Sequence, residues 1–490
     1  MVEAFGQGLF TVLSWPALGL LFLGVIIGIV FGAVPGLNAL LAVALVLPFI
    51  WGMDPFGALV LLMAIIAAVN TGNTIPAVLF NVPGSPAASA TILDGYPMAK
   101  KGQAARALSA AYVSSAMGGL FGAVVIMLII PFLRPLVLLF MSPERFMMVL
   151  WGIIMVGLLS GRERIKGLLA GLLGLSIAMI GMDPQLGVPR YTFGQIYLLQ
   201  GLPLIPVLMG LFALPEVIDL SARGRVAGII LEIGGEFWGG IRDAFNRWIL
   251  VFRSSGLGVI IGAIPGLGSV AAAFYAYGQA VQTSKEKDTF GKGNVDGVIA
   301  PESANNAVIG GELIPTLAFG VPGSPLMAVL LMAFLILGIM PGKSMLTEHL
   351  ELTFSLIWAL LLANLVATGI CLASTRLVAR IATVQAASLI PFVLLFVIWG
   401  SYMTQSTPSD LLTAYAFGIL GYVMMRFQWP RVPLLVGFVL GGLAENYLYT
   451  SWAAYGASFL LRPITMILLS LVLFTIAFIW WSSRGERIRR

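Results

Sequence analysis

Residues 20–51 read LLFLGVIIGIVFGAVPGLNALLAVALVLPFIW. This stretch has no charged residue, and Pro35 and Gly36 divide it into two apolar runs. A helix that crosses a bilayer needs about 20 apolar residues. Proline lacks a backbone donor and clashes with the preceding turn, so a helix tends to break where it occurs. We therefore predict two apolar helices in a membrane, interrupted at the Pro-Gly pair.

The rest of the chain has the same character. Of its 490 residues, 59% are hydrophobic and only 10% are charged, against about 25% charged residues in soluble domains. Asp54 is the only charged residue between Glu3 and Asp94, and residues 254–284 and 313–342 have none. We predict an all-α polytopic membrane protein with about 11 or 12 transmembrane helices plus re-entrant hairpins.

The net charge of +6 does not indicate a nucleic-acid partner. The basic residues are scattered between apolar runs, as expected for loops on the cytoplasmic side of a membrane. The tail with Arg484, Arg487, Arg489 and Arg490 predicts a cytoplasmic C-terminus. The N-terminus has no Lys or Arg before Lys100, and we favour the outer side for it.

The chain divides into three parts. Residues 1–220 form an N-terminal transmembrane half, and residues 248–490 form a C-terminal one. Between them, residues 221–247 combine charged and aromatic side chains, which predicts an amphipathic connector at the membrane interface. With one His, one Cys and no P-loop lysine motif, no metal, cofactor or ATP site is expected.

Three short motifs occur twice in the same order. The first set is Gly32–Leu37, Thr71–Pro76 and Asn81–Pro86, and the second set is Gly262–Leu267, Gly310–Pro315 and Gly320–Pro325. The first blocks lie 230 residues apart, and the other two lie 239 apart. Matching Gly/Pro interruptions in two halves are typical of secondary transporters, whose repeats are often inverted. We predict two structural repeats, inverted relative to each other.

The interruptions also predict a binding site. Broken backbone at membrane depth is tolerated where it faces protein or a watery cavity, and a half-helix that starts there directs free N–H groups and its positive dipole end into that cavity. Residues 55–93 and 313–342 contain no Lys or Arg, so we expect neutral donors to bind an anion. The predicted substrate-binding residues are Pro35, Gly36, Asn38, Thr71, Gly72, Asn73, Pro83, Gly84, Ser85, Gly266, Ser269, Asn305, Asn306, Gly310, Gly311, Pro322, Gly323 and Ser324.

A coupling ion, Na⁺ or H⁺, needs a site of its own. An ionisable residue within a span indicates a functional site, and we predict that Glu302, Ser303 and Asn305 hold this ion. The alternative is that Glu302 lies at the interface and caps a helix.

Other classes of function stay open at this point. An intramembrane enzyme would need a nucleophile beside a base, and Ser85 and Ser324 have no neighbouring His or Lys in the sequence. A channel would show rings of one charge, which the sequence lacks. A scaffold subunit is a further alternative.

Several of these motifs together resemble a known family. They are Gly32–Leu37, Pro83–Ser85, Asp94–Ala99, Gly102, Ala107, Leu108, Pro301–Asn306, Gly310, Gly311, Pro322 and Gly323. In this order, from about residue 15 to 445, they resemble the large membrane subunit of tripartite tricarboxylate transporters, the TctA family. Many relatives have Tyr-Gly-Gly-Ser where this chain has Asn70–Asn73, so the resemblance does not identify one substrate.

The resemblance implies a bacterial inner-membrane location and a transporter of three components. The other two are a small membrane subunit with about four spans (TctB-like) and a periplasmic solute-binding protein (TctC-like). It also implies import driven by an ion gradient, with citrate, other di- and tricarboxylates or aromatic acids as substrates. By analogy we expect alternating access with an elevator-like motion.

Overall fold

The computed structural model describes residues 1–159, 164–222, 233–384 and 386–488, with side chains up to residue 477 apart from those of residues 222, 386 and 387. The helices before the connector are α1 (Val2–Leu13), α2 (Ala17–Ala33), α3 (Ala39–Val46), α4 (Pro55–Phe80), α5 (Ser89–Lys100), α6 (Ala104–Leu138), α7 (Ser142–Leu159), α8 (Arg164–Ala178), α9 (Leu204–Leu208) and α10 (Leu214–Ala222). The later helices are α11 (Phe237–Asn246), α12 (Trp248–Gly262), α13 (Gly268–Thr283), α14 (Asp296–Phe319), α15 (Pro325–Ile336), α16 (Lys343–Thr347), α17 (Leu350–Ala373), α18 (Thr375–Ile381), α19 (Ile390–Tyr402), α20 (Pro408–Arg426), α21 (Arg431–Tyr455) and α22 (Pro463–Ile488).

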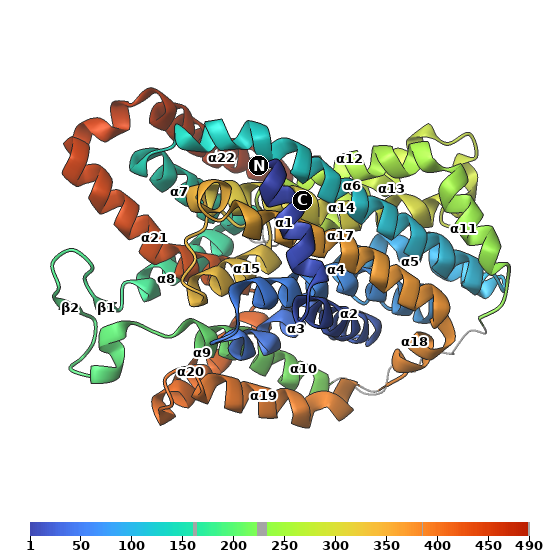
Figure 1. Ribbon diagram of the computed structural model, residues 1–490, viewed down its shortest axis with the longest axis horizontal. Coiled ribbons are helices and arrows are strands. Elements are labelled where there is room, and N and C mark those ends of the chain that lie inside the picture. Colours follow the sequence, from blue (N-terminus) through green and yellow to red (C-terminus); the bar gives the residue numbers. More distant parts are fainter. Residues whose placement is uncertain (160–163, 223–232, 385, 489–490) are drawn as a thin grey trace.

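Short elements connect these helices. The 3₁₀ turns are η1 (Leu47–Ile50), η2 (Pro86–Ala88), η3 (Ile196–Gln200), η5 (Lys287–Thr289), η6 (Ala386–Leu389) and η7 (Gly456–Leu461), and a π-helical segment, η4 (Met209–Ala213), joins α9 to α10. Strands β1 (Gly181–Met182) and β2 (Pro189–Arg190) pair antiparallel and protrude at the left edge of Figure 1. In the turn between these two strands, hydrogen bonds from the N–H groups of Leu186 and Gln185 lower the pKa of Asp183.

The prediction of an all-α polytopic membrane protein is confirmed. Within the described residues, six helical segments are long and apolar enough to cross a membrane by length and composition: Pro55–Phe80, Ala104–Leu138, Ser142–Leu159, Leu204–Ser221, Leu350–Ala373 and Arg431–Leu461. The pair α1 and α2, bent by 68°, would be a seventh. Five further apolar helices have 10–17 residues: Ala39–Ile50, Trp248–Gly262, Pro325–Ile336, Ile390–Tyr402 and Pro463–Ala477. The predicted 11 or 12 crossings would require these shorter helices, so that count stays a prediction.

Two helices form the centre of the protein. α4 is buried from Gly57 to Phe80, and α14 is buried over nearly all of its length. A helix that is apolar on every side packs on every side: α4 contacts α2, α6 and α17, and α14 contacts α6, α12 and α13. Asp54 begins α4 by accepting a hydrogen bond from the Gly57 N–H at 3.1 Å.

The breaks lie at two of the three motifs in each set. α2 and α3 are separated at Gly36 (φ 91°), and α12 and α13 are separated at Gly266 (φ 88°). α4 ends at Asn81 (φ 58°) and α14 ends at the matching Gly320 (φ 66°). Glycine and asparagine adopt these left-handed conformations most readily.

The middle motifs differ from the prediction. Thr71–Pro76 and Gly310–Pro315 do not interrupt the backbone, because they lie within the continuous helices α4 and α14. Each proline removes a single helical hydrogen bond, and a membrane helix tolerates this where neighbouring helices cover the freed carbonyl.

Helix crossings also match between the two sets. A Cβ added to Gly28 of α2 would lie 2.7 Å from the Ile65 carbonyl oxygen, and one added to Gly258 of α12 would lie 2.5 Å from the Ala304 carbonyl oxygen. These pairs have the same sequence offsets as the motifs. Small residues allow membrane helices to approach this closely. The local geometry thus recurs in both sets, while the inverted relation of the two halves stays a prediction.

The connector contains the end of α10 and the helix α11, and its residues 223–232 lie outside the described part. α11 packs against α6 and is tied to it by an ion pair of Asp243 with Arg106 at 2.7 Å. Trp238 of α11 is exposed. The basic tail that predicts a cytoplasmic C-terminus has no described side chains.

We predict that Gly258→Ala destabilises the protein and that Gly256→Ala, on the same helix, does not. The new methyl group at position 258 would overlap the α14 backbone, whereas nothing lies within 4 Å of a Cβ at position 256. Overpacking of this kind costs about 1–3 kcal/mol. The unfolding temperature of the detergent-purified variants measures the difference, and equal values for both variants would contradict the tight α12–α14 crossing.

Candidate functional site

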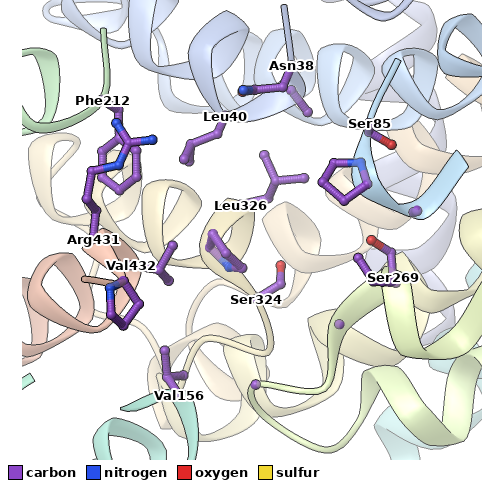
Figure 2. Close-up of a pocket in the computed structure, with 18 of the residues that line it drawn as sticks. Asn38, Leu40, Ser85, Val156, Phe212, Ser269, Ser324, Leu326, Arg431 and Val432 are labelled. Atoms are coloured by element: carbon purple, nitrogen blue, oxygen red, sulfur yellow. The ribbon is translucent and has the colours of Figure 1, made fainter. Parts of the chain in front are cut away.

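A cavity of about 790 Å³ lies where the interrupted segments meet, a size typical of small-molecule sites. Its wall contains the N-terminal residues of α3, η2, α13 and α15, which are the four elements that follow the breaks. Six residues predicted from the sequence line it: Asn38, Asn73, Ser85, Gly266, Ser269 and Ser324. Figure 2 shows Asn38, Ser85, Ser269 and Ser324 arranged around this space. The cavity therefore combines polar groups from both motif sets.

In the first set, two asparagines and a serine shape the wall. Asn38 caps α3, its Oδ1 accepting from the Leu41 N–H at 2.9 Å. Asn73 of α4 donates through Nδ2 to the Ser85 Oγ at 2.8 Å. Asn70, one turn earlier, also lines the cavity and donates to the Asn305 carbonyl oxygen of α14 at 3.2 Å. These bonds hold the Ser85 turn against α4 and link α4 to α14.

In the second set, the two matching positions are also hydrogen-bonded to each other, but one of them is an acid. The Ser324 Oγ donates to the Glu312 Oε2 at 2.7 Å, where the first set has Ser85 and Asn73. Both pairs are separated by 12 residues, and the two serines lie 239 residues apart. Ser324 also caps α15, accepting from the Met327 N–H at 3.4 Å. The Gly266 N–H donates to the Gly323 carbonyl oxygen at 3.1 Å and joins the two turns of this set.

The sequence predicted a cavity with neutral donors only, but the cavity wall contains charged residues. Arg431, at the start of α21, lies on the wall opposite Ser85 and Ser269 (Figure 2). Its guanidinium lies 5.2 Å from the Phe212 ring centre, pairs with Glu216 at 3.0 Å and donates to the Leu211 carbonyl oxygen at 3.2 Å. Arg431, Glu216 and Glu312 all line the cavity, and none of them is among the site residues predicted from the sequence.

Sequence patterns alone do not bring these charged residues together, for a physical reason. Glu216 and Arg431 lie outside both motif sets and meet only through the packing of α10 and α21 on α20. The usable signals were local: Arg431 follows Trp429 and Pro430 at a helix start, and Glu312 lies within a motif block.

Twelve predicted substrate-binding residues do not line this cavity: Pro35, Gly36, Thr71, Gly72, Pro83, Gly84, Asn305, Asn306, Gly310, Gly311, Pro322 and Gly323. Some of the glycines among them are sites of close packing. A Cβ on Gly72 would lie 2.8 Å from the Ile29 carbonyl oxygen, and one on Gly84 would lie 2.7 Å from the Gly32 carbonyl oxygen. Gly310 and Gly311 meet the backbones of Gly122 and Val259. These glycines allow the close packing that positions the site, and other residues form the cavity wall.

The predicted ion site is a separate buried cluster. Glu302 is fully buried in α14 and accepts from the Thr91 Oγ1 of α5 at 2.6 Å. It therefore does not cap a helix at the interface. Ser303 bonds to the Ile299 carbonyl oxygen at 2.6 Å, and Asn306 donates to the Ser115 carbonyl oxygen at 3.0 Å and to Asn364. The side-chain amide of Asn305 is buried and has no hydrogen-bond partner among the described residues. The structure thus places Glu302, Ser303, Asn305 and Asn306 outside the cavity wall.

Asp94 anchors a loop. It is buried in α5, and its carboxylate accepts from the N–H groups of Gly293 and Asn294 at 2.8 Å and from the Tyr277 hydroxyl at 3.0 Å. It thereby fastens the hydrophilic segment before α14 to α5.

Apolar broken helices around a cavity that receives polar side chains from both motif sets define a multi-pass membrane protein of the transporter class. The chain matches the model of the tripartite tricarboxylate transporter TctA family over residues 18–436, and it belongs to this family. It is therefore a membrane subunit of a tripartite tricarboxylate transporter.

Two relatives come from Agrobacterium vitis. An "uncharacterized 52.8 kDa protein in TAR-I ttuC' 3'region" is 32% identical over 87% of this chain and 85% of its own length. An "uncharacterized protein in TAR-II ttuC' 3'region" is 37% identical over 39% of this chain and 79% of its own length. No solved structure matches the chain.

We predict that the cavity is open to water-soluble reagents. Cys371 is the single cysteine and is fully buried, so Cys371→Ala gives a cysteine-free background. A Ser269→Cys variant in this background should react with a membrane-impermeant maleimide, because Ser269 lines the cavity. Ser254→Cys, buried in α12, is the matched control and should stay unlabelled. Equal labelling of both variants, measured by mass spectrometry, would contradict an accessible cavity.

Proposed function

We propose that this chain is the substrate-translocating subunit of a binding-protein-dependent secondary transporter that imports small organic carboxylates. The observation that carries this proposal is the convergence of Ser85 and Ser324, from matching turns of the two motif sets, on one cavity. The substrate class is a di- or tricarboxylate or an aromatic acid.

The chemistry of the cavity suits a carboxylate. Helix N-termini present unbonded N–H groups and a positive dipole end, which attract anions. α3, α13 and α15 each begin at the wall, and Ser85 and Ser269 add hydroxyl donors. Such neutral donors bind an anion without the tight hold of a dedicated ion pair, which favours release on the far side.

Arg431 adds the one cationic group among the residues that line the cavity. A guanidinium binds carboxylates through parallel N–H donors. Because Arg431 already pairs with Glu216, a substrate carboxylate would compete with the Glu216 carboxylate for it. Binding of this kind is weaker than binding to a free arginine and is therefore reversible.

The remaining parts of the proposal follow from family membership and charge distribution. The chain would lie in the bacterial inner membrane with its C-terminus in the cytoplasm. It would work with a small four-span subunit and a periplasmic solute-binding protein that delivers the substrate. A Na⁺ or H⁺ gradient would drive alternating access, in which one helix bundle moves in an elevator-like manner.

The direct test is uptake into proteoliposomes that contain this chain and the small subunit, with the binding protein added outside. Radiolabelled citrate, succinate and benzoate represent the three acid classes. We expect accumulation of at least one of them under an imposed Na⁺ or H⁺ gradient and without ATP. Uptake that requires ATP and no gradient would rule out a secondary transporter.

We predict opposite effects for the two partners of the cavity ion pair. Arg431→Gln removes a charged donor worth about 1.5–3 kcal/mol, so the KM for the transported acid should rise about 10- to 100-fold. Glu216→Gln frees the guanidinium from its competitor, so the KM should fall. Arg190→Gln is the control, because Arg190 pairs with Glu445 at 2.5 Å and does not line the cavity. A rise of KM in both cavity variants would show that the pair is structural.

A further inference from the structure

Glu312 is a buried acid that faces the proposed substrate. It is 3% exposed, and it lines the cavity from α14. Its Oε2 accepts the Ser324 hydroxyl at 2.7 Å. Within the part of the chain that the structure describes, no Lys or Arg forms an ion pair with it. Buried charges are normally paired or neutralised, so this carboxylate requires an explanation.

The fold itself does not require an acid at this position. In the first motif set, the position that matches Glu312 is Asn73, whose neutral amide donates to Ser85 at 2.8 Å. The backbone contact matches in the two places, since a Cβ on Gly84 would lie 2.8 Å from the Asn73 Cα and one on Gly323 would lie 2.8 Å from the Glu312 Cα. An amide therefore satisfies the same turn.

The surroundings of Glu312 do not neutralise it. Glu216 and Arg431 are the other charged residues on the cavity wall, and they pair with each other. α3, α4, α13 and α15 contribute asparagine, serine, glycine, proline and apolar residues. A negatively charged Glu312 would thus repel an anionic substrate within the same cavity, and the repulsion is strong where the dielectric constant is low.

We propose that Glu312 is the cation site that couples substrate binding to the ion gradient. A proton or a sodium ion on its carboxylate, assisted by the Ser324 hydroxyl, removes the repulsion and lets the substrate carboxylate bind. By linkage, the bound acid strengthens the binding of the cation by the same factor. This inference rests on the proposed function, and it assigns the coupling to Glu312 in place of the Glu302 cluster.

Glu312→Gln is the decisive variant, because Asn73 shows that an amide suits this turn. Glu302→Gln tests the competing assignment on the same helix, because Glu302 is an equally buried acid that lies outside the cavity wall. Each variant is reconstituted with the small subunit and assayed with the binding protein. Gradient-driven accumulation of radiolabelled citrate, succinate or benzoate is compared with exchange of labelled for unlabelled acid in the absence of any gradient.

For the wild type we expect both accumulation and exchange. For Glu312→Gln we expect accumulation to fall about ten-fold or more while exchange continues, because the neutral amide admits the acid without a cation. Glu302→Gln should retain both activities. Separate Na⁺ and H⁺ gradients identify the cation.

Three results would overturn the assignment. They are undiminished accumulation in Glu312→Gln, loss of exchange together with accumulation in that variant, and loss of accumulation in Glu302→Gln alone. If the wild type transports none of the acids, the proposed function itself fails.

A second readout does not depend on transport. If the transport assay identifies sodium as the cation, sodium should raise the unfolding temperature of the purified wild type, because a ligand that binds only the folded state stabilises it. Choline replaces sodium as the control salt. This cation effect should persist in Glu302→Gln and disappear in Glu312→Gln. Its persistence in Glu312→Gln would also overturn the assignment.

Discussion

The structure depends on one constraint, which is that backbone polar groups within a membrane must find partners inside the protein. The helices that precede the breaks meet it at their C-terminal ends. The Val82 N–H bonds to the Pro76 carbonyl oxygen at 3.4 Å, and the Val321 N–H bonds to the Pro315 carbonyl oxygen at 3.2 Å. The helices that follow the breaks start at the cavity, where Asn38 and Ser324 provide part of the capping. The N-terminal ends of four elements are thereby gathered around one cavity.

The sequence predicted that helix breaks meet at one cavity, but it did not predict which of the proline motifs form breaks. Paired Pro-Gly motifs at Pro35 and Pro265 indicated breaks, and breaks can persist only beside a cavity or protein. Pro76 and Pro315 gave the same signal and lie within continuous helices. The difference depends on whether neighbouring helices cover the freed carbonyl, which is a tertiary property. Single-sequence patterns do not record it.

The site shows the same division between local and tertiary information. Asn38, Ser85, Ser269 and Ser324 follow helix breaks, which the sequence indicated, and they line the cavity. Glu302 and Glu312 are both acids in α14; the sequence singled out Glu302 for the coupling ion, whereas Glu312 is the one that lines the cavity. Ten residues of helix separate them by about 15 Å along the axis. α14 is buried on every side, so its hydrophobic pattern does not show which face meets the cavity.

The two motif sets differ in having Asn73 in the first and Glu312 in the second, and the charge of the cavity wall therefore depends on whether Glu312 holds a cation. With Glu312 charged, the wall carries one positive group, Arg431, and two negative groups, Glu216 and Glu312, and an anion is disfavoured. With a cation on Glu312 the wall is neutral, and the helix N-termini and hydroxyl groups decide the binding. In the proposed mechanism, the charge returns when that cation leaves on the cytoplasmic side, and it expels the acid. A symmetric cavity with asparagine in both sets would bind the anion regardless of the ion gradient, and it could equilibrate a carboxylate across the membrane but not accumulate it.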